Sequence, residues 1–204
     1  VSEGQEISLG QTTLRFHMTP MVHWPETMVT YLVEEATLFS ADAFGTFGTV
    51  GDNIVDDENT FEEYKDEMIR YYSNIVGKYG AQVQALLKKA ATLDIQMICP
   101  LHGPVLKENL GYYIEKYQTW SSYEPEDKGV FIAYASIYGH TAEAAEYLAE
   151  ELKKEGVEKV AVCDLAREDM AEAIEDAFRY DRIVLAAATY DGGIFTWMDD
   201  FLHH

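Results

Sequence analysis

The sequence predicts an α/β protein in two parts, because the pattern of its apolar segments changes near residue 125. Residues 1–60 hold short apolar or alternating segments between turns, which is typical of β-strands. Residues 129–204 alternate a continuous apolar segment with an amphipathic helix, which is typical of a parallel, doubly wound sheet. With 204 residues, 48% of them hydrophobic, the chain suits one or two domains with real cores.

The first part is expected to contain strands at EISLG, TLRFHM, VTYLV and TLFS. Two helical stretches follow, FEEYKDEMIRYYSNIVGKY and AQVQALLKKAATL, with Gly80 separating them. IQMICP predicts a buried strand that stops at Pro100, and a helix is expected near KENLGYYIEKYQTW. The polar segment 121–129, SSYEPEDKG, is the best linker. We therefore expect domains at residues 1–125 and 126–204.

In the second part, strands are expected at GVFIAYA, EKVAVCDL and RIVLAAATY. The intervening helices are TAEAAEYLAEELKKEG, which we expect to stop at Gly156, and REDMAEAIEDAFRY, and a third helix begins at IFTWMDDFLHH. A sheet of only three parallel strands buries little surface and leaves an open edge. The sequence therefore predicts part of a larger domain.

Composition and charge exclude several classes of partner. The net charge of -21 and the pI near 4.4 disfavour nucleic acid and anionic membrane surfaces. No apolar run approaches the roughly eighteen residues that cross a bilayer. The residues from Val1 onward do not have the basic and apolar regions of a signal peptide. Cys99 and Cys163 lie far apart in the sequence, each in an apolar segment. We expect a cytoplasmic protein that does not contact membranes.

The loop SIYGHT, Ser136–Thr141, lies between a predicted strand and its helix. Its backbone N–H groups and the hydroxyls of Ser136 and Thr141 are suited to a phosphate monoester. It matches neither G-x-x-x-x-G-K-[ST] nor G-x-G-x-x-G, which disfavours a nucleoside triphosphate or a classical dinucleotide. An ordinary helix capped by Thr141 remains open at this point.

A second loop, TYDGG at residues 189–193, follows the last predicted strand and favours the ligand interpretation. In doubly wound sheets, ligands bind beyond the carboxyl ends of the strands. The two glycines let the backbone approach a flat ring, and Tyr190 can stack on it.

With these two loops, residues 129–204 resemble the first half of flavodoxin, with S-x-Y-G-x-T in place of T-x-T-G-x-T and T-Y-D-G-G as a flavin-edge loop. The resemblance implies FMN as cofactor. The residues implied to bind the phosphate are Ser136, Ile137, Tyr138, Gly139, His140 and Thr141, and those implied to line the isoalloxazine are Thr189, Tyr190, Asp191 and Gly192.

Three candidate metal ligands occur in the first part, each at a strand end or in a turn. They are His23 in PMVHWPE, Asp42 in LFSADAFG and His102 in CPLHGP. Taken singly, each is a packed or turn residue. Taken together, they favour a shared site, because imidazole and a bridging carboxylate suit iron or zinc.

These segments resemble the later ligand segments of flavodiiron proteins (A-type flavoproteins), in which a metallo-β-lactamase-like domain precedes a flavodoxin domain. The resemblance implies a partial metallo-β-lactamase-like αβ/βα sandwich followed by a partial flavodoxin-like doubly wound sheet. It implies that Asp42 bridges two irons, and that His23 and His102 bind one iron each. The first ligand cluster of the family, H-x-E-x-D-H, is not in these residues. We therefore expect a middle portion of such a protein, with little activity alone.

For the whole protein, the resemblance implies that FMN passes electrons to the diiron centre, which reduces dioxygen to water, nitric oxide to nitrous oxide, or both. A rubredoxin-like protein or reduced deazaflavin is the implied donor, and a head-to-tail homodimer is the implied assembly. Two alternatives are a zinc-dependent hydrolase of the β-lactamase fold and an FMN electron carrier without a working metal site.

Overall fold

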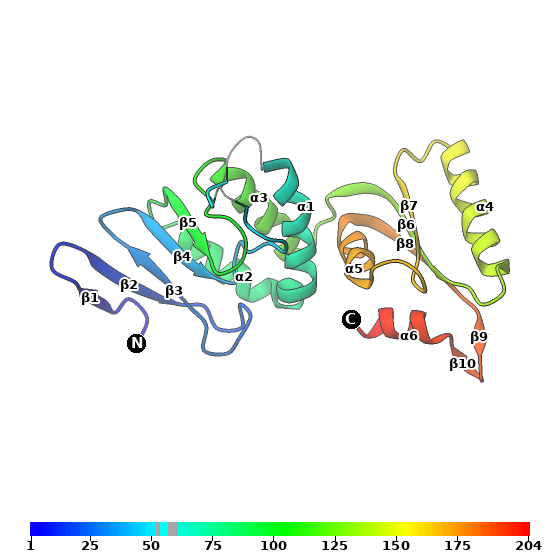
Figure 1. The fold of residues 1–204 in the computed structure, drawn as a ribbon, viewed down its shortest axis with the longest axis horizontal. Helices are drawn as coiled ribbons and strands as arrows, with labels where there is room; N and C mark the ends of the chain where they lie inside the picture. Colours follow the sequence, from blue (N-terminus) through cyan, green and yellow to red (C-terminus); the bar gives the residue numbers. More distant parts are fainter. Residues whose placement is uncertain (52–53, 57–60) are drawn as a thin grey trace. The chain divides into compact units, whose positions relative to one another are not determined.

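The computed structural model describes residues 1–51, 54–56 and 61–204 of the chain. These residues form two compact units, Val1–Tyr123 and Glu124–His204, which are described separately below (Figure 1). Within the described ranges, no helix has the length and apolar character needed to cross a membrane.

The first unit contains a mixed five-stranded sheet (Figure 1). In sheet order its strands are β1 (Glu6–Ser8), β2 (Thr13–Met18), β3 (Met28–Leu32), β4 (Thr37–Ala41) and β5 (Met97–Pro100). The first four pair antiparallel, whereas β5 runs parallel to β4, with Ala41 opposite Pro100. Because β4 and β5 are parallel, their carboxyl ends meet at the same edge of the sheet.

The helices of this unit are α1 (Phe61–Tyr71), α2 (Gly80–Ala90) and α3 (Leu110–Ser121), with a π-helical turn at Tyr72–Val76 and a 3₁₀ turn at Gly77–Tyr79. Gly80 was predicted to separate two helices, but it begins α2. A Cβ there would lie 2.6 Å from the Ser121 carbonyl oxygen, so this glycine allows α2 and the end of α3 to approach closely. The predicted linker is shorter than expected, because α3 includes Ser121 and the next strand begins at Asp127.

Buried aromatic rings join α3 to the loop that follows β4. The rings of Phe44 and Tyr117 stack at 4.2 Å, and Tyr72 packs edge-on against Tyr117 at 5.0 Å. The Phe44 N–H also donates a 2.6 Å hydrogen bond to the Tyr117 hydroxyl. The loop after β4 is therefore attached to the helices by packing and by a buried hydrogen bond.

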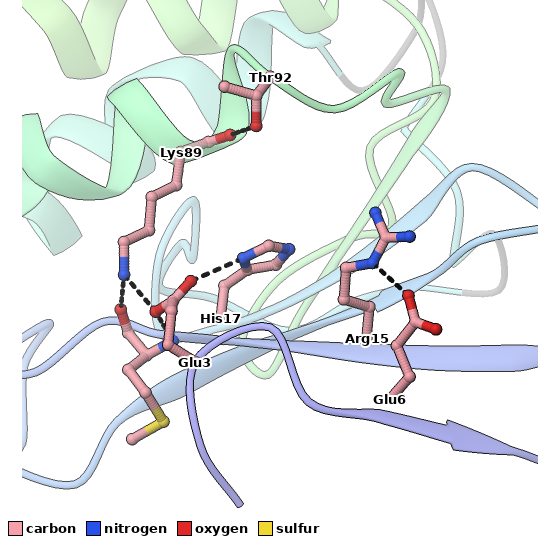
Figure 2. A network of polar contacts seen from close by, with 7 residues as sticks. Glu3, Glu6, Arg15, His17, Lys89 and Thr92 are labelled. Carbon is pink, nitrogen blue, oxygen red and sulfur yellow. Dashed lines mark hydrogen bonds and ion pairs between the residues drawn. The ribbon is translucent and has the colours of Figure 1, made fainter.

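A polar network fixes the N-terminal segment onto the sheet and α2 (Figure 2). The Glu3 carboxylate accepts hydrogen bonds from Lys89 Nζ at 2.5 Å and from the Met18 N–H at 2.9 Å, and it lies 3.0 Å from His17 Nδ1. The hydrogen bond from the Lys89 ammonium is the main cause that lowers the pKa of Glu3 to about 2. Lys89 also donates to the Met18 carbonyl, so α2 is held against β2.

The second unit is a parallel three-stranded sheet in the order β7 (Val160–Asp164), β6 (Asp127–Ala135), β8 (Tyr180–Ala187). Alternate residues of β6 face opposite sides, as a strand requires. Val130, Ile132 and Tyr134 pack with α4 (His140–Lys154), whereas Phe131 and Ala133 pack with α5 (Met170–Arg179) and α6 (Thr196–His203). Helices on both faces of a parallel sheet confirm the predicted doubly wound arrangement (Figure 1).

Two details of this unit refine the expectation. Gly156 follows α4 with a φ of 91°, and its N–H bonds the Lys153 carbonyl, which ends the helix as predicted. The predicted last strand is divided, because β8 stops at Ala187 and a short hairpin follows, formed by β9 (Thr189–Tyr190) and β10 (Gly193–Ile194).

The buried tyrosines predict that alkaline pH destabilises the first unit. Burial raises the pKa of Tyr71, Tyr72, Tyr113 and Tyr117 above the usual value of 10.0. Their contribution to stability is complete below pH 10 and is lost as pH rises, because only the unfolded chain then ionises easily. Above pH 10, each of these tyrosines adds a slope of about 1.4 kcal/mol per pH unit, so the four together add roughly 5.5 kcal/mol per pH unit.

Urea unfolding of the chain between pH 8 and 11.5, followed by circular dichroism, measures this slope. The variant Tyr117→Phe is expected to reduce it, because one of the buried tyrosines that cause the slope is removed. An unfolding free energy that stays constant from pH 9 to 11.5 would contradict the prediction.

Gly103→Ala is expected to destabilise the turn after β5. Gly103 has a φ of 85°, and a Cβ there would lie 2.2 Å from the buried Thr46 Oγ1. Both backbone strain and the clash predict a loss of more than about 1 kcal/mol. The matched control Gly111→Ala, on α3 with no neighbour within 4 Å, is expected to keep the melting temperature or raise it. Equal melting temperatures for the Gly103 variant and the unmodified chain would show that the turn tolerates a side chain.

Candidate metal centre and flavin-binding loops

The structure brings His23, Asp42 and His102 together at one edge of the five-stranded sheet. Asp42 directly follows β4, and His102 lies two residues beyond β5, so the parallel pairing of these strands places both at their shared carboxyl end. The Leu101 N–H donates to the Ala41 carbonyl at 2.9 Å and continues this pairing beyond the strands. His23 comes from the turn between β2 and β3, which closes through a hydrogen bond from the Thr19 N–H to the Thr27 carbonyl.

An irregularity in β4 directs Asp42 away from the ladder. The pairing register shifts between Phe39 and Ala41, and Ala41 adopts a left-handed conformation with a φ of 54°. The buried Ser40 hydroxyl donates a 2.7 Å hydrogen bond to the Ala43 carbonyl, which stabilises the turn that follows. A bulge and a strained residue at a strand end are devices that re-aim a side chain beside a functional site.

The two imidazoles approach different oxygens of one carboxylate. His23 Nε2 lies 3.5 Å from Asp42 Oδ2, and His102 Nε2 lies 3.4 Å from Asp42 Oδ1. Both distances exceed an ordinary N–H···O hydrogen bond. Donor atoms that share a metal ion at about 2.1 Å lie roughly 3 to 3.5 Å apart, which these pairs match.

The donor set fits part of a centre with two metal ions rather than a complete mononuclear site. Within the described ranges, no group of three or more His, Cys, Asp or Glu side chains gathers around one point that could hold a metal ion. Instead, His23 lies beside one oxygen of the Asp42 carboxylate and His102 lies beside the other. Asp42 therefore links two candidate metal positions, each with one histidine. Imidazole nitrogen and carboxylate oxygen are ligands that iron and zinc accept.

Exposure differs among the three side chains. The Asp42 side chain is 14% exposed, His23 is 28% exposed and His102 is 56% exposed. The carboxylate is therefore the innermost group of the cluster, and the histidines flank it nearer the surface.

Tyr71, the last residue of α1, belongs to this site although the sequence interpretation missed it. Its hydroxyl interacts electrostatically with the Asp42 carboxylate, and its ring lies 5.7 Å from the His102 ring and 5.1 Å from Phe47. Burial, together with the nearby Asp42 charge, raises the pKa of Tyr71 well above its usual value, so the phenol stays a neutral donor. In the sequence it resembles any aromatic residue on the buried face of a helix, and no local pattern distinguishes it.

The phosphate-loop candidates lie together between β6 and α4. Helix α4 begins at His140, and its N-cap is Gly139, with a φ of 96° and no side-chain cap. Thr141 therefore lies inside the first turn, and the alternative of a helix capped by Thr141 is wrong. The buried Ser136 Oγ accepts a 3.1 Å hydrogen bond from the Gly139 N–H, which leaves its own proton for another acceptor.

This loop is chemically suited to a phosphate. The first N–H groups of a helix have no acceptor within the helix, and its N-terminal end is positive. Hydroxyl groups at Ser136, Tyr138 and Thr141 add neutral donors, and the Tyr138 side chain is exposed. Ile137 contributes only its backbone to polar contacts. The donor set therefore fits the phosphate end of FMN.

The second loop candidates form the β9–β10 hairpin just beyond β8. Tyr190 pairs with Gly193, and the two residues between them, Asp191 and Gly192, both have positive φ, as a tight hairpin turn requires. Tyr190 is 56% exposed, and its ring meets the Phe195 ring edge-on at 5.9 Å. Because β6 and β8 are parallel, this hairpin and the phosphate loop follow the same edge of the sheet, where ligands bind in such folds.

Comparison with protein families agrees with this arrangement. A family model described as an ODP family beta lactamase matches residues 1–103, and a flavodoxin domain model matches residues 131–204. The beta-lactamase-like match confirms the fold expected for the first part, and the flavodoxin match confirms that of the second.

Two curated relatives match nearly the whole chain. An uncharacterized protein of Methanocaldococcus jannaschii is 36% identical over 99% of this chain and 50% of its own length. The anaerobic nitric oxide reductase flavorubredoxin of Vibrio vulnificus is 33% identical over 93% of this chain and 39% of its own length. The chain thus spans about half or less of the length of these relatives.

Solved structures match over the entire chain. The rubredoxin oxygen:oxidoreductase from Desulfovibrio gigas is 26% identical, with a TM-score of 0.92, and 51% of it is covered. The flavodiiron protein from Giardia intestinalis is 25% identical, with a TM-score of 0.93, and 49% of it is covered. The chain therefore belongs to the flavodiiron proteins, a family whose cofactors are FMN and a diiron centre.

Proposed function

We propose that the protein containing this chain is an oxidoreductase that reduces nitric oxide, dioxygen or both at a diiron centre, with electrons delivered through FMN. The observation that carries this proposal is the contact of two imidazoles with opposite oxygens of Asp42, in a chain that also has a flavodoxin-like unit. The names of two similar proteins support the substrates, since one is a nitric oxide reductase flavorubredoxin and the other a rubredoxin oxygen:oxidoreductase.

In the proposed metal centre, Asp42 bridges the two iron positions, and His23 and His102 each supply one ligand. Iron at these positions supplies redox change and the binding of a diatomic substrate. Asp42 holds both positions through one carboxylate, and the Tyr71 hydroxyl interacts with that carboxylate and supports its orientation. The closeness of His102 to the surface leaves this side of the cluster open to a small molecule.

In the proposed flavin site, Ser136 donates its hydroxyl proton to the phosphate, while the amide groups that begin α4 donate from the helix end. The phosphate-binding residues are Ser136, Ile137, Tyr138, Gly139, His140 and Thr141. Tyr190 stacks on the isoalloxazine, and the tight turn of the hairpin brings the backbone near the ring. The ring-lining residues are Thr189, Tyr190, Asp191 and Gly192.

We also propose a rubredoxin-like protein or a reduced deazaflavin as the electron donor and a head-to-tail homodimer as the assembly. The name of the Desulfovibrio gigas enzyme, a rubredoxin oxygen:oxidoreductase, supports the first kind of donor. A distance argument supports the dimer. Electron transfer needs a short distance between the two cofactors, and two cofactor sites within one chain can point away from each other. A cytoplasmic location is supported by the free thiols of Cys99 and Cys163, which suit a reducing compartment.

Replacing the proposed bridge is expected to remove iron without removing flavin. In Asp42→Asn, a neutral amide replaces the carboxylate that two metal ions share, so the iron content and the consumption of nitric oxide and dioxygen are expected to fall at least tenfold. Iron is measured by elemental analysis, and FMN is measured by its absorbance. Asp199→Asn, on the exposed side of α6, serves as the control.

The same measurements separate the alternatives. Zinc without redox-active iron in the unmodified protein would contradict the reductase and favour a hydrolase of the β-lactamase fold. A normal flavin band without any bound metal would instead favour an FMN electron carrier.

Tyr71→Phe is expected to weaken metal binding while leaving the fold intact. The change removes only the hydroxyl that interacts with Asp42, and the loss of such a supporting partner typically lowers metal affinity about 10- to 100-fold. Competition titration with Co²⁺ or Zn²⁺ measures the affinity. Tyr72→Phe, at the next and equally buried position, is the matched control. Equal affinities in both variants would show that Tyr71 does not support the carboxylate.

A further inference from the structure

We propose that Thr46 is a positioning residue for His102, and that its buried hydroxyl orients the imidazole of that histidine for a metal ion. This inference rests on the metal centre proposed above. It concerns the second ring nitrogen of His102, Nδ1, because the first, Nε2, is the one that lies 3.4 Å from the Asp42 carboxylate.

Thr46 contacts both segments that carry the candidate ligands. It lies on the loop after β4, four residues beyond Asp42, and its N–H donates a 3.3 Å hydrogen bond to the His102 carbonyl. Its side chain lies against the next residue of the His102 turn, since a Cβ on Gly103 would come 2.2 Å from Thr46 Oγ1 and 3.1 Å from Thr46 Cβ. The backbone and the side chain of Thr46 are therefore both placed against the turn that carries His102.

The Thr46 hydroxyl is buried without a hydrogen-bond partner. The residue is 2% exposed, and its Oγ1 makes no hydrogen bond within the described part of the chain. An unpaired buried hydroxyl destabilises a fold, and such groups in native proteins call for a specific explanation. The branched side chain has few rotamers, so the hydroxyl stays close to the turn. A donor that becomes available when a metal ion binds would supply the missing partner.

Metal binding makes the His102 imidazole a donor of this kind. An imidazole that binds a metal through Nε2 is neutral and carries its proton on Nδ1. Ligating histidines almost always donate this proton to an acceptor, which fixes the tautomer and the orientation of the ring. The Thr46 hydroxyl oxygen can accept it, because a hydroxyl is both a donor and an acceptor.

Water is the competing acceptor, because the His102 side chain is 56% exposed. A water molecule accepts the proton without fixing the ring, since it moves when the ring rotates. Thr46 is instead held by burial and by its backbone hydrogen bond to the same turn. A hydrogen bond to this residue would restrict the imidazole to the orientation that a metal ion requires.

The test compares Thr46→Val, which keeps the shape of the side chain without the hydroxyl, with Thr46→Ser, which keeps the hydroxyl. Competition titration with Co²⁺ measures metal affinity, and thermal unfolding of the metal-free chain measures stability. We expect Thr46→Val to bind Co²⁺ about tenfold more weakly, because a supporting hydrogen bond of the ligand is lost. Its metal-free melting temperature is expected to stay the same or rise, because an unpaired polar group is removed. Thr46→Ser is expected to keep the Co²⁺ affinity of the unmodified chain.

Proton NMR of the Co²⁺-loaded chain adds a signature that a purely structural role would not change. The unpaired electrons of Co²⁺ shift the N–H proton of a ligating imidazole out of the normal range, and the signal absent from His102→Asn belongs to His102. We expect this proton to exchange slowly with water in the unmodified chain and in Thr46→Ser, and too fast for a signal in Thr46→Val. Thr19→Val, which removes another buried hydroxyl that has no partner among the described residues, is the matched control and is expected to keep the signal.

The outcomes separate this inference from the metal centre itself. Unchanged Co²⁺ affinity and unchanged proton exchange in Thr46→Val would overturn the role of Thr46 and leave the metal centre standing. Weaker Co²⁺ binding together with a lower metal-free melting temperature would show that Thr46 acts on the fold, which also overturns the inference. Failure of the unmodified chain to bind Co²⁺ would overturn the metal centre, and the role of Thr46 with it.

Discussion

The candidate metal centre depends on the parallel pairing of β4 with β5. These strands are separated by more than fifty residues in the sequence, yet their register places Ala41 opposite Pro100. The residues that follow the two strands, Asp42 and His102, must then leave the sheet at the same edge. Parallel strands require a long crossover, and here α1 and α2 lie within it. Other features of the site refine this placement: the bulge before Ala41 turns Asp42 out of the ladder, and the turn at Gly103 packs on Thr46.

The crossover also contributes to the site directly. Helix α1 ends at Tyr71, whose hydroxyl reaches the Asp42 carboxylate, and the buried rings beyond it contact Tyr117 on α3. Tyr117 in turn accepts a hydrogen bond from the Phe44 N–H, two residues after Asp42. The carboxylate is thus held from two directions, by its own backbone through Phe44 and by its side chain through Tyr71. Positions that bind a metal ion need such support, because a loosely held ligand loses entropy when the ion binds.

The parts that were predictable from the sequence are those encoded locally. Alternating apolar strands and amphipathic helices were enough to predict the doubly wound sheet, and strand-terminal polar residues were enough to bring His23, Asp42 and His102 into one hypothesis. Contacts between distant residues were not predictable in the same way. Tyr71 looks like a core aromatic, and Gly80 looks like a helix breaker until the Ser121 carbonyl beside it is known. Gly139 caps α4 in place of Thr141 because its backbone, rather than a side chain, makes the turn.

The same geometric rule positions both candidate sites, although their chemistry differs. In each unit, two parallel strands end at one edge, and the segments just beyond them carry the functional groups. At the end of β4 and β5 these groups are anionic or imidazole ligands, which attract cations. At the end of β6 the group is a helix N-terminus with hydroxyls, which attracts an anion. The acidic surface of the chain makes this second task harder, since a net charge of -21 repels a phosphate. A loop that presents amide dipoles and hydroxyl groups at short range overcomes that repulsion, because the long-range field of exposed carboxylates is screened by salt and contacts at hydrogen-bond distance are not.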